Sequence, residues 1–440
     1  MRVVIVGGGI GGMATALALA DRGHEVRVLE SEQTAGGKVG TLRLGPWQVE
    51  TGPFAILQRA STEPWLRRLK LESSVVKADA AAKHRFIVKD RQLAAVPTSP
   101  PALLTSKALS WRAKLAILRE PFLPRGKSED ETVAAFARRR LGLEIAENFV
   151  CPFVTGVFAG DYEQLSLRSA FPTLAQLERE HGSLLRGLYA QQKERQRRGE
   201  LPPDLISFAG GMGDLTHALA TELGDRLTVA AAVSSIAKNG NCFVVIANGA
   251  RFEADRVVLA LPAQAASLLL RSLDENMASA FSEIPAVDVA AISLGYSGAG
   301  SAVPSGFGFL VPRCEPFSML GTLFVSGTFP QPSLPDALHL RVLVGGSKDP
   351  EALSLSDQAL VGRAESELAS ILGRLPPRTF VHVQRWRGAI AQYTVGHHRR
   401  MELIEERGRG LQLYSTGASL RGVGVNDVLA DATAIAAKFQ

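Results

Sequence analysis

The first thirty residues contain the feature that most constrains how this chain can fold. An apolar run of β-branched residues at 3–6 is typical of a buried parallel strand. Three glycines follow it in the spacing G-x-G-x-x-G: Gly7, Gly9 and Gly12. A helical stretch from Met13 to Arg22 comes next, and a second strand at 26–29 ends at Glu30. This order predicts a βαβ unit whose glycine turn and helix start bind a dinucleotide pyrophosphate, with Glu30 placed to accept hydrogen bonds from a ribose diol.

Two other kinds of N-terminal segment compete with this interpretation. Arg2 precedes an apolar stretch that ends in Ala-Leu-Ala, which is reminiscent of a secretory signal peptide, and a transmembrane helix would also be apolar here. Glycine fills the middle of the stretch and a well-formed second strand follows, and both facts disfavour these alternatives. We therefore expect a nucleotide-binding unit.

Length and composition indicate a soluble globular protein of two or three domains, since 46% of the 440 residues are hydrophobic and 21% are charged. The formal net charge of +6 is a mild basic excess, which suits an anionic substrate or an anionic membrane surface. No nucleic-acid recognition motif accompanies it, so no nucleic-acid partner is expected. The three scattered cysteines form neither a disulfide framework nor a metal motif, and we expect a reducing cytoplasm and no metal site.

The sequence changes character between about 97 and 201. Apolar and basic residues alternate over 103–119, which suits an amphipathic helix. Such a helix either lies on a membrane interface or packs its apolar face on its own domain, and the residues alone favour packing. A basic run at 193–198 is typical of a solvated helix face or loop. From about 286 to 392 the sequence is rich in strands and predicts a separate sheet.

Two segments after Glu30 narrow the dinucleotide signal. The first contains Gly36, Gly37 and Lys38, and the second, at 47–53, reads WQVETGP. Together they resemble the FAD-binding fingerprint of the flavin amine oxidase superfamily, in which a GG-R/K-x-x-T segment and an E-x-G segment follow the acidic residue. Lysine stands here where arginine is usual.

The C-terminal segment complements this fingerprint. Residues 413–417 predict a strand that ends in Gly417, and the segment GVGVND at 422–427 opens a final helix. Free N–H groups and the positive dipole end of that helix would face the pyrimidine edge of a flavin and stabilise negative charge as the ring is reduced. The chain is thus expected to leave the nucleotide fold and return to it.

Segments outside the nucleotide motifs resemble those of the oxygen-dependent protoporphyrinogen IX oxidases, and the similarity runs nearly end to end. These segments are GVFAGD at 156–161, LS at 165–166, FP at 171–172, GFGFLVP at 306–312, MLG at 319–321, GG at 345–346 and GVND at 424–427. The resemblance implies an α/β fold (α+β overall) with a Rossmann-like FAD-binding domain, a β-rich substrate domain and a helical membrane-associating domain. The implied boundaries are 1–85, 203–263 and 405–440 for the FAD-binding domain, 86–96 and 264–404 for the substrate domain, and 97–202 for the helical domain.

The resemblance also implies two sets of site residues. FAD contacts are expected from Gly7, Gly9, Ile10, Gly11, Gly12, Glu30, Ser31, Gly37, Lys38, Gly52, Pro53, Val233, Ala260, Trp386, Gly417, Gly424, Val425 and Asn426. The implied substrate pocket involves the backbone at Gly156 together with Phe307, Leu310, Leu323 and Leu343. Leu310 and Leu323 would sandwich a pyrrole ring and Leu343 would lie beside the bridge carbon, although apolarity alone would place all three leucines in the core.

No side chain is expected to act as a catalytic acid, base or nucleophile, because the sequence offers no convincing Ser-His-Asp set or carboxylate pair. The arginine that plant and animal members place against a substrate propionate has no secure counterpart; Arg67 and Arg68 are near in sequence.

The implied reaction is the FAD-dependent oxidation of protoporphyrinogen IX to protoporphyrin IX, with O2 as acceptor and H2O2 as by-product. Ferrochelatase is an implied pathway neighbour, the oligomeric state would be a monomer or homodimer, and the location would be the cytoplasm at the inner face of the cell membrane. Three alternatives stay open: a coproporphyrinogen III oxidase of the same fold, an amine oxidase or carotenoid desaturase, and a flavin-binding partner without activity.

Overall fold

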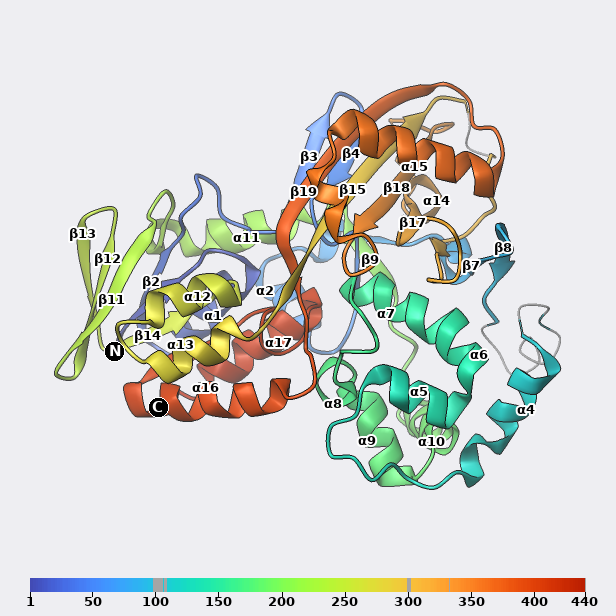
Figure 1. Cartoon of the computed structure of the whole chain (residues 1–440). Helices are drawn as coiled ribbons and strands as arrows, with labels where there is room; N and C mark the ends of the chain where they lie inside the picture. The colour runs from blue at the N-terminus through green and yellow to red at the C-terminus, as the bar shows by residue number, and fades with distance from the viewer. Residues whose placement is uncertain (98–105, 107–108, 299–301, 332, 440) are drawn as a thin grey trace. The chain divides into compact units, whose positions relative to one another are not determined.

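The computed structural model describes residues 1–97, 106, 109–298, 302–331 and 333–439 (Figure 1). The chain forms two compact units, each assembled from segments that are far apart in sequence. Unit 1 comprises Met1–Lys77, Pro203–Ala286 and His397–Gln440, and unit 2 comprises Ala78–Pro202 and Val287–Gly396.

A five-stranded parallel sheet forms the centre of unit 1, in the strand order β10-β2-β1-β14-β20. Its strands are β1 (Arg2–Val6), β2 (Glu25–Leu29), β10 (Leu227–Thr228), β14 (Arg256–Leu259) and β20 (Leu413–Ser415). Val3 to Val6 of β1 are buried, as expected of a parallel strand that is covered on both faces. The predicted Rossmann-like sheet is confirmed, and strands from both ends of the chain belong to it.

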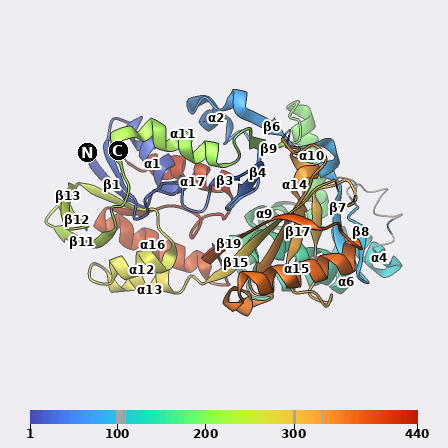
Figure 2. The same cartoon turned by 90° about the horizontal axis from the view of Figure 1, so that it is seen from above.

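Four helices share one apolar cluster with this sheet: α1 (Ile10–Ala20), α2 (Glu63–Arg68), α11 (Gly213–Leu223) and α17 (Val425–Ala436). Helix α1 packs against α17, and the two views of the molecule agree on this (Figures 1 and 2). Helix α1 begins at Ile10, ahead of the predicted start at Met13, because Gly9 already serves as its N-cap.

The rest of unit 1 surrounds this core. Its strands are β3 (Thr41–Leu44), β4 (Trp47–Glu50), β5 (Ile56–Leu57), β6 (Val75–Lys77), β9 (Leu205–Phe208), β11 (Val233–Asn239), β12 (Cys242–Ala247) and β13 (Ala250–Ala254). Its remaining helices are η1 (Glu72–Ser74), η5 (Gly224–Arg226), α12 (Ala263–Leu270), α13 (Glu275–Ser282) and α16 (His397–Leu411). Helices α12 and α13 belong here because α13 packs on α16, which in turn contacts β20. The sequence predicts a substrate domain over 264–404, and the division into three domains stays a prediction.

Unit 2 contains a seven-stranded sheet in the order β19-β15-β18-β17-β16-β7-β8. Its strands are β7 (Arg85–Lys89), β8 (Gln92–Ala95), β15 (Ala286–Tyr296), β16 (Gly308–Leu310), β17 (Gly321–Phe324), β18 (Leu338–Gly345) and β19 (Arg378–Ala391). Helix α15 (Asp357–Leu372) packs its apolar side on one face of this sheet, where Leu360 and Leu368 join Leu340 and Val342 in one cluster (Figure 2). The strand-rich prediction for 286–392 is confirmed, whereas α15 within it was not expected.

Between 111 and 197 unit 2 is mainly helical. The helices are α4 (Trp111–Arg119), η3 (Glu120–Phe122), α5 (Val133–Leu141), α6 (Leu143–Ile145), the π-helical turn η4 (Ala146–Val150), α7 (Cys151–Phe158), α8 (Leu167–Ala170), α9 (Pro172–His181) and α10 (Leu184–Arg197); η2 (Ala80–Lys83), α14 (Val325–Thr328) and η6 (Pro350–Ser354) lie elsewhere in unit 2. Part of the amphipathic helix predicted over 103–119 lies outside the described residues. The described helix begins at Trp111, where the Ser110 hydroxyl accepts a hydrogen bond from the Ala113 amide.

Candidate cofactor and substrate sites

The glycine turn after β1 is a place of close backbone approach. Gly7 has φ +107°, and a Cβ there would lie 2.5 Å from the Ala260 carbonyl oxygen. A Cβ on Gly12 would lie 1.9 Å from the Gly7 carbonyl oxygen. Only glycine fits at these two positions, because a side chain would force strand and helix apart. Ala260, which was predicted to contact the cofactor, therefore lies directly beside the turn.

Gly9, at the start of α1, has open space around it, unlike Gly7 and Gly12. A Cβ there would meet no atom of the described residues within 4 Å, and the first turn of α1 contains no acidic side chain. The unpaired N–H groups of this turn, together with the positive end of the helix dipole, form a cradle for an anion. This open space is where the sequence predicts the pyrophosphate.

Glu30 is held against the same turn. Its carboxylate accepts hydrogen bonds from the Gly8 amide at 2.6 Å, the Glu32 amide at 2.9 Å and the Ser31 hydroxyl at 3.1 Å. The backbone carbonyl of Glu30 accepts from the Ala231 amide at 2.6 Å, just before β11 begins at Val233. The contact with Gly8 was not predicted, and it fixes the carboxylate at the glycine turn.

The second part of the predicted fingerprint folds back onto the first. The Gly36 amide donates to the Gly8 carbonyl at 2.9 Å, and a Cβ on Gly37 would lie 3.3 Å from the Gly9 Cα. A Cβ on Gly52 would lie 1.8 Å from the Lys38 carbonyl oxygen, so the turn that ends in Pro53 packs tightly on this segment. Burial lowers the pKa of Lys38, because the charged ammonium loses its hydration. A nearby anion would offset this loss and stabilise the charged form.

The C-terminal residues arrive at the same loop. A Cβ on Gly11 would lie 3.4 Å from the Gly417 Cα and 3.2 Å from Val428. Helix α17 begins at Val425 with Gly424 as its N-cap. The Asn426 side chain accepts from the Thr62 hydroxyl at 3.0 Å and donates to the Leu57 carbonyl at 2.7 Å, so it fixes the helix start to β5.

Asp431 is a residue of this site that sequence reasoning missed. Its carboxylate accepts from the Thr416 hydroxyl at 2.7 Å, from the Gly417 amide at 3.2 Å and from Arg421 at 3.0 Å. It therefore orders the turn at Gly417. No motif signals this role, because a lone aspartate on a helix normally faces solvent.

Unit 1 thus gathers all but one of the predicted FAD-binding residues. Trp386 lies on β19 of unit 2. Two observations show that the glycine turn after β1 fits a dinucleotide. There is open space at Gly9, and there is no room for side chains at Gly7 and Gly12. In the described part of the chain, no cluster of His, Cys, Asp and Glu could hold a metal ion, and no helix is long and apolar enough to cross a membrane.

The predicted substrate leucines share one face of the seven-stranded sheet. In the register of β16, β17 and β18, Leu310 lies opposite Gly321, which lies opposite Leu343, while Leu323 lies opposite Gly308. Residues paired across a sheet point to the same side, so the three leucines face away from α15. They are half-buried, whereas the alternate residues Phe309 and Val342 are fully buried in the cluster under α15.

Helix α7 and β7 border this leucine face. A Cβ on Gly156 of α7 would lie 2.7 Å from the side chain of Leu310, so the helix backbone approaches the leucine directly. The Arg85 guanidinium of β7 lies over the Phe307 ring, 5.2 Å from its centroid. The structure therefore brings Gly156 and Phe307 to the borders of the same surface.

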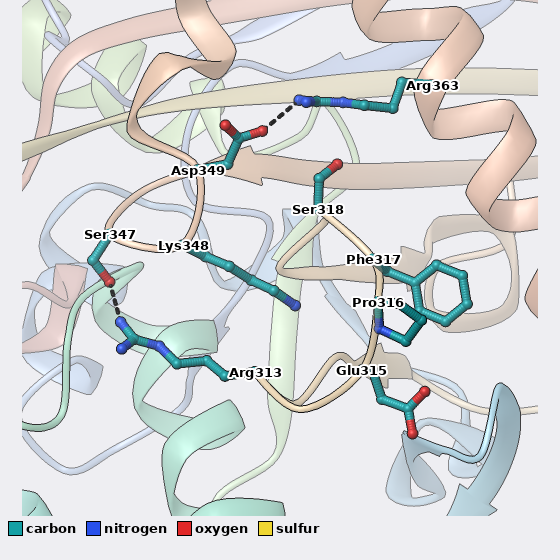
Figure 3. Close-up of a pocket in the computed structure, with 9 residues that line it drawn as sticks. All are labelled: Arg313, Glu315, Pro316, Phe317, Ser318, Ser347, Lys348, Asp349 and Arg363. Atoms are coloured by element: carbon teal, nitrogen blue, oxygen red, sulfur yellow. Dashed lines mark hydrogen bonds and ion pairs between the residues drawn. The ribbon is translucent and has the colours of Figure 1, made fainter.

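A separate polar cavity of about 520 Å³ lies in unit 2 near the ends of β16 and β18 (Figure 3). The Lys348 ammonium donates to the carbonyls of Val311, Pro312 and Met319 at 3.2–3.3 Å, and Arg363 pairs with Asp349 at 2.6 Å. Burial lowers the pKa of Lys348 to about 8. The charged side chains that line this cavity bind one another or the backbone, and these interactions hold the surrounding loops together. We therefore interpret the cavity as structural.

Comparison with known proteins places these observations in a family. The model of the family of flavin-containing amine oxidoreductases matches residues 10–438. Human protoporphyrinogen oxidase is 36% identical over 475 aligned positions, which cover 97% of this chain and 96% of the human protein. Coproporphyrinogen III oxidase of Bacillus subtilis (strain 168) is 27% identical over 455 positions, which cover 97% and 95% of the two chains. A crystal structure of a protein from Exiguobacterium sp. 255-15 has a similar fold, with a TM-score of 0.84 at 23% identity and 99% and 98% coverage.

Proposed function

The chain belongs to the family of flavin-containing amine oxidoreductases, and from this membership we propose that it is an FAD-dependent oxidase that converts protoporphyrinogen IX to protoporphyrin IX with O2 as acceptor. The observation that carries the proposal is the half-buried leucine face of unit 2, formed by Leu310, Leu323 and Leu343. An apolar surface with few polar anchors suits a flat macrocycle.

The residues around the glycine turn would hold the cofactor. The chemistry that bound FAD would supply is two-electron oxidation by hydride acceptance, with O2 taking up the two electrons and two protons as H2O2. The start of α1 at Gly9 would bind its pyrophosphate, and Glu30 would bind a ribose diol. The start of α17 at Val425 would stabilise negative charge on the flavin, and Lys38 would add a positive charge near the phosphates.

The leucine face would bind and orient the substrate. Leu310 and Leu323 would enclose a pyrrole ring, Leu343 would lie beside the bridge carbon, and the Gly156 backbone would border the ring. Arg85 would meet a propionate, since its exposed guanidinium lies over the Phe307 ring at the border of this face. We assign no side chain to acid–base catalysis, so the contribution of the protein is to hold the ring flat and exclude water.

Coproporphyrinogen III oxidation is the second candidate function. The similarity to coproporphyrinogen III oxidase of Bacillus subtilis favours it. Coproporphyrinogen III carries four carboxylates, whereas protoporphyrinogen IX carries two. The deciding experiment mixes the purified FAD-loaded protein with each porphyrinogen under air and follows porphyrin fluorescence together with H2O2. We expect faster turnover of protoporphyrinogen IX. Faster turnover of coproporphyrinogen III would reverse the assignment, and no turnover of either in a yellow holoprotein would indicate a flavin-binding protein of another role.

We also propose that the protein attaches peripherally to the inner face of the cell membrane through α4 and η3. Trp111, Leu115, Leu118 and Phe122 recur at helical spacing and are exposed, with Trp111 at 66% and Phe122 at 81%. The basic residues Arg112, Lys114 and Arg119 accompany them, a combination that suits an anionic interface.

Co-sedimentation with vesicles tests this attachment. We expect binding to vesicles that contain anionic phosphatidylglycerol, and weaker binding when Trp111 and Phe122 are both replaced by serine. Leu201→Ser is the matched control, because Leu201 is also exposed but lies beyond α10. Equal binding by all variants would contradict the proposal.

Two further proposals concern partners. The product would pass to ferrochelatase, and the protein would be a monomer or a homodimer. Sedimentation equilibrium gives the oligomeric state, and a coupled assay with added ferrochelatase shows whether transfer of the porphyrin is faster than its release to solution.

A further inference from the structure

Strand β18 presents different residues on its two faces. Leu338, Leu340, Val342 and Val344 lie in the apolar cluster beneath α15. The alternate residues His339, Arg341 and Leu343 point to the opposite face, which carries the leucines of the proposed substrate site. Arg341 is only 5% exposed, which is unusual for an arginine. An apolar substrate surface therefore contains a buried guanidinium.

The strand register identifies the neighbours of Arg341 on the paired strands. One row across the sheet reads Ser293, Arg341, Leu323, Gly308 and Arg85. The adjacent row reads Ala291, Leu343, Gly321, Leu310 and Ile87. None of these ten residues is acidic and two are arginines, so these two rows contribute positive charge and no carboxylate to the face. His339 adds none, because burial lowers its pKa to about 3.

We propose that Arg341 binds a carboxylate of the tetrapyrrole and thereby sets the position of the ring over Leu323 and Leu343. This inference rests on the proposed function. A guanidinium offers five N–H donors in a planar fork, so it can receive a carboxylate through two bonds and still keep contacts to the protein. Such a bond is stronger in apolar surroundings than at an exposed surface.

Three other arginines are less suited to bind the carboxylate that we assign to Arg341. Arg85 stands three strands away in the same row, roughly 14 Å at about 4.8 Å per strand, so the two arginines would meet different carboxylates. Arg67 and Arg68 lie in unit 1, where Arg68 pairs with Asp21 and Glu222.

The test compares a substrate with free carboxylates and one without. The purified FAD-loaded wild type, Arg341→Met and Arg341→Lys are assayed with protoporphyrinogen IX and with its dimethyl ester. Arg341→Met should raise KM for the diacid about 10- to 100-fold, the equivalent of one or two steps of 1.4 kcal/mol, and leave KM for the diester within about twofold. Arg341→Lys should show a smaller loss for the diacid. Arg378 is an exposed arginine of β19 that pairs with Glu365 of α15, and Arg378→Met should change KM for neither the diacid nor the diester.

A second measurement separates this proposal from the proposed function. Fluorescence titration of the oxidised porphyrin and its diester gives affinities that need no turnover. If the wild type oxidises neither porphyrinogen yet prefers the diacid, and Arg341→Met loses that preference, the oxidase proposal fails and the role of Arg341 stands. If Arg341→Met and Arg341→Lys affect diacid and diester equally in both measurements, Arg341 is a structural cation and the proposal is overturned.

Discussion

Gly11 and Gly417 lie against each other, with a Cβ on Gly11 only 3.4 Å from the Cα of Gly417. Gly11 is in the first turn of α1, and Gly417 follows β20 with φ +107°. This contact brings both ends of the polypeptide to the glycine turn. A cofactor bound at the start of α1 would consequently also depend on the last helix of the chain.

The space at Gly9 leads to the first prediction. Gly9→Trp should fill the anion cradle and weaken FAD binding by at least about 100-fold, roughly 2.7 kcal/mol. The protein should still fold, because the new Cβ would meet no described atom within 4 Å apart from those of its chain neighbours. Gly9→Ala should retain the yellow cofactor. Gly362→Trp, at another open glycine in α15, controls for the bulk of the side chain. Recovery of fully loaded holoprotein from Gly9→Trp would contradict the assigned pyrophosphate site.

Lys38 should make FAD binding depend on pH at the alkaline end. Burial lowers its pKa below the usual 10.5, so the ammonium loses its proton earlier than an exposed lysine. The charged form attracts phosphate, and FAD affinity should therefore fall as the pH rises through the lowered pKa. Titrations of apoprotein with FAD from pH 7 to 10 should show this slope for the wild type and a flatter one for Lys38→Met. An identical slope in both proteins would remove Lys38 from the phosphate site.

The βαβ unit and the start of α17 could be predicted from the sequence because their determinants are local. A glycine that has room for no Cβ, such as Gly12, is encoded at its own position, and a helix start depends on the few residues beside it. The order of apolar runs then suffices to predict strand, turn and helix.

The substrate face could not be predicted from the residues alone. In β18 the sequence LHLRVLVG is mostly apolar, so it does not show which alternate residues face the core. That distinction depends on the pairing of β18 with β15 and β17, which are distant in sequence. The family resemblance pointed to Leu343, but Arg341 became visible only through the register. Asp431 was missed for a similar reason, since its partners Thr416 and Gly417 meet it only in the folded chain.

Glu30 provides a test of the predicted ribose contact. Glu30→Gln keeps the shape of the side chain but replaces a charged acceptor of the Gly8 amide by a neutral one. We expect FAD affinity to fall by about 10- to 100-fold, or roughly 1.4–2.7 kcal/mol, because hydrogen bonds to charged groups are the stronger ones. Isothermal titration of the apoprotein measures this loss. Glu32→Gln is the matched control, since the Glu32 side chain is exposed, and an equal loss in both variants would speak against a specific role for Glu30.

The buried pair of Glu120 and Arg140 predicts how the helical part of unit 2 responds to acid. Burial by itself raises the pKa of Glu120, but hydrogen bonds from Ser183, Leu184 and Leu185 and the charge of Arg140 together hold it below 4.5. The ionised pair therefore contributes stability at neutral pH, and that contribution is lost as the pH falls through the lowered pKa. Glu120→Gln should cost about 3 kcal/mol of unfolding free energy at pH 7, because the buried Arg140 then keeps only the more distant Glu178, at 3.6 Å, as a carboxylate partner. Urea unfolding at pH 7 and in acid should show that the difference in unfolding free energy from the wild type shrinks below pH 4.5. Glu194→Gln, at an exposed position of α10, should shift the unfolding free energy by no more than about 0.5 kcal/mol at either pH. A gap that stays constant with pH would mean that the pair is held by packing and not by its charge.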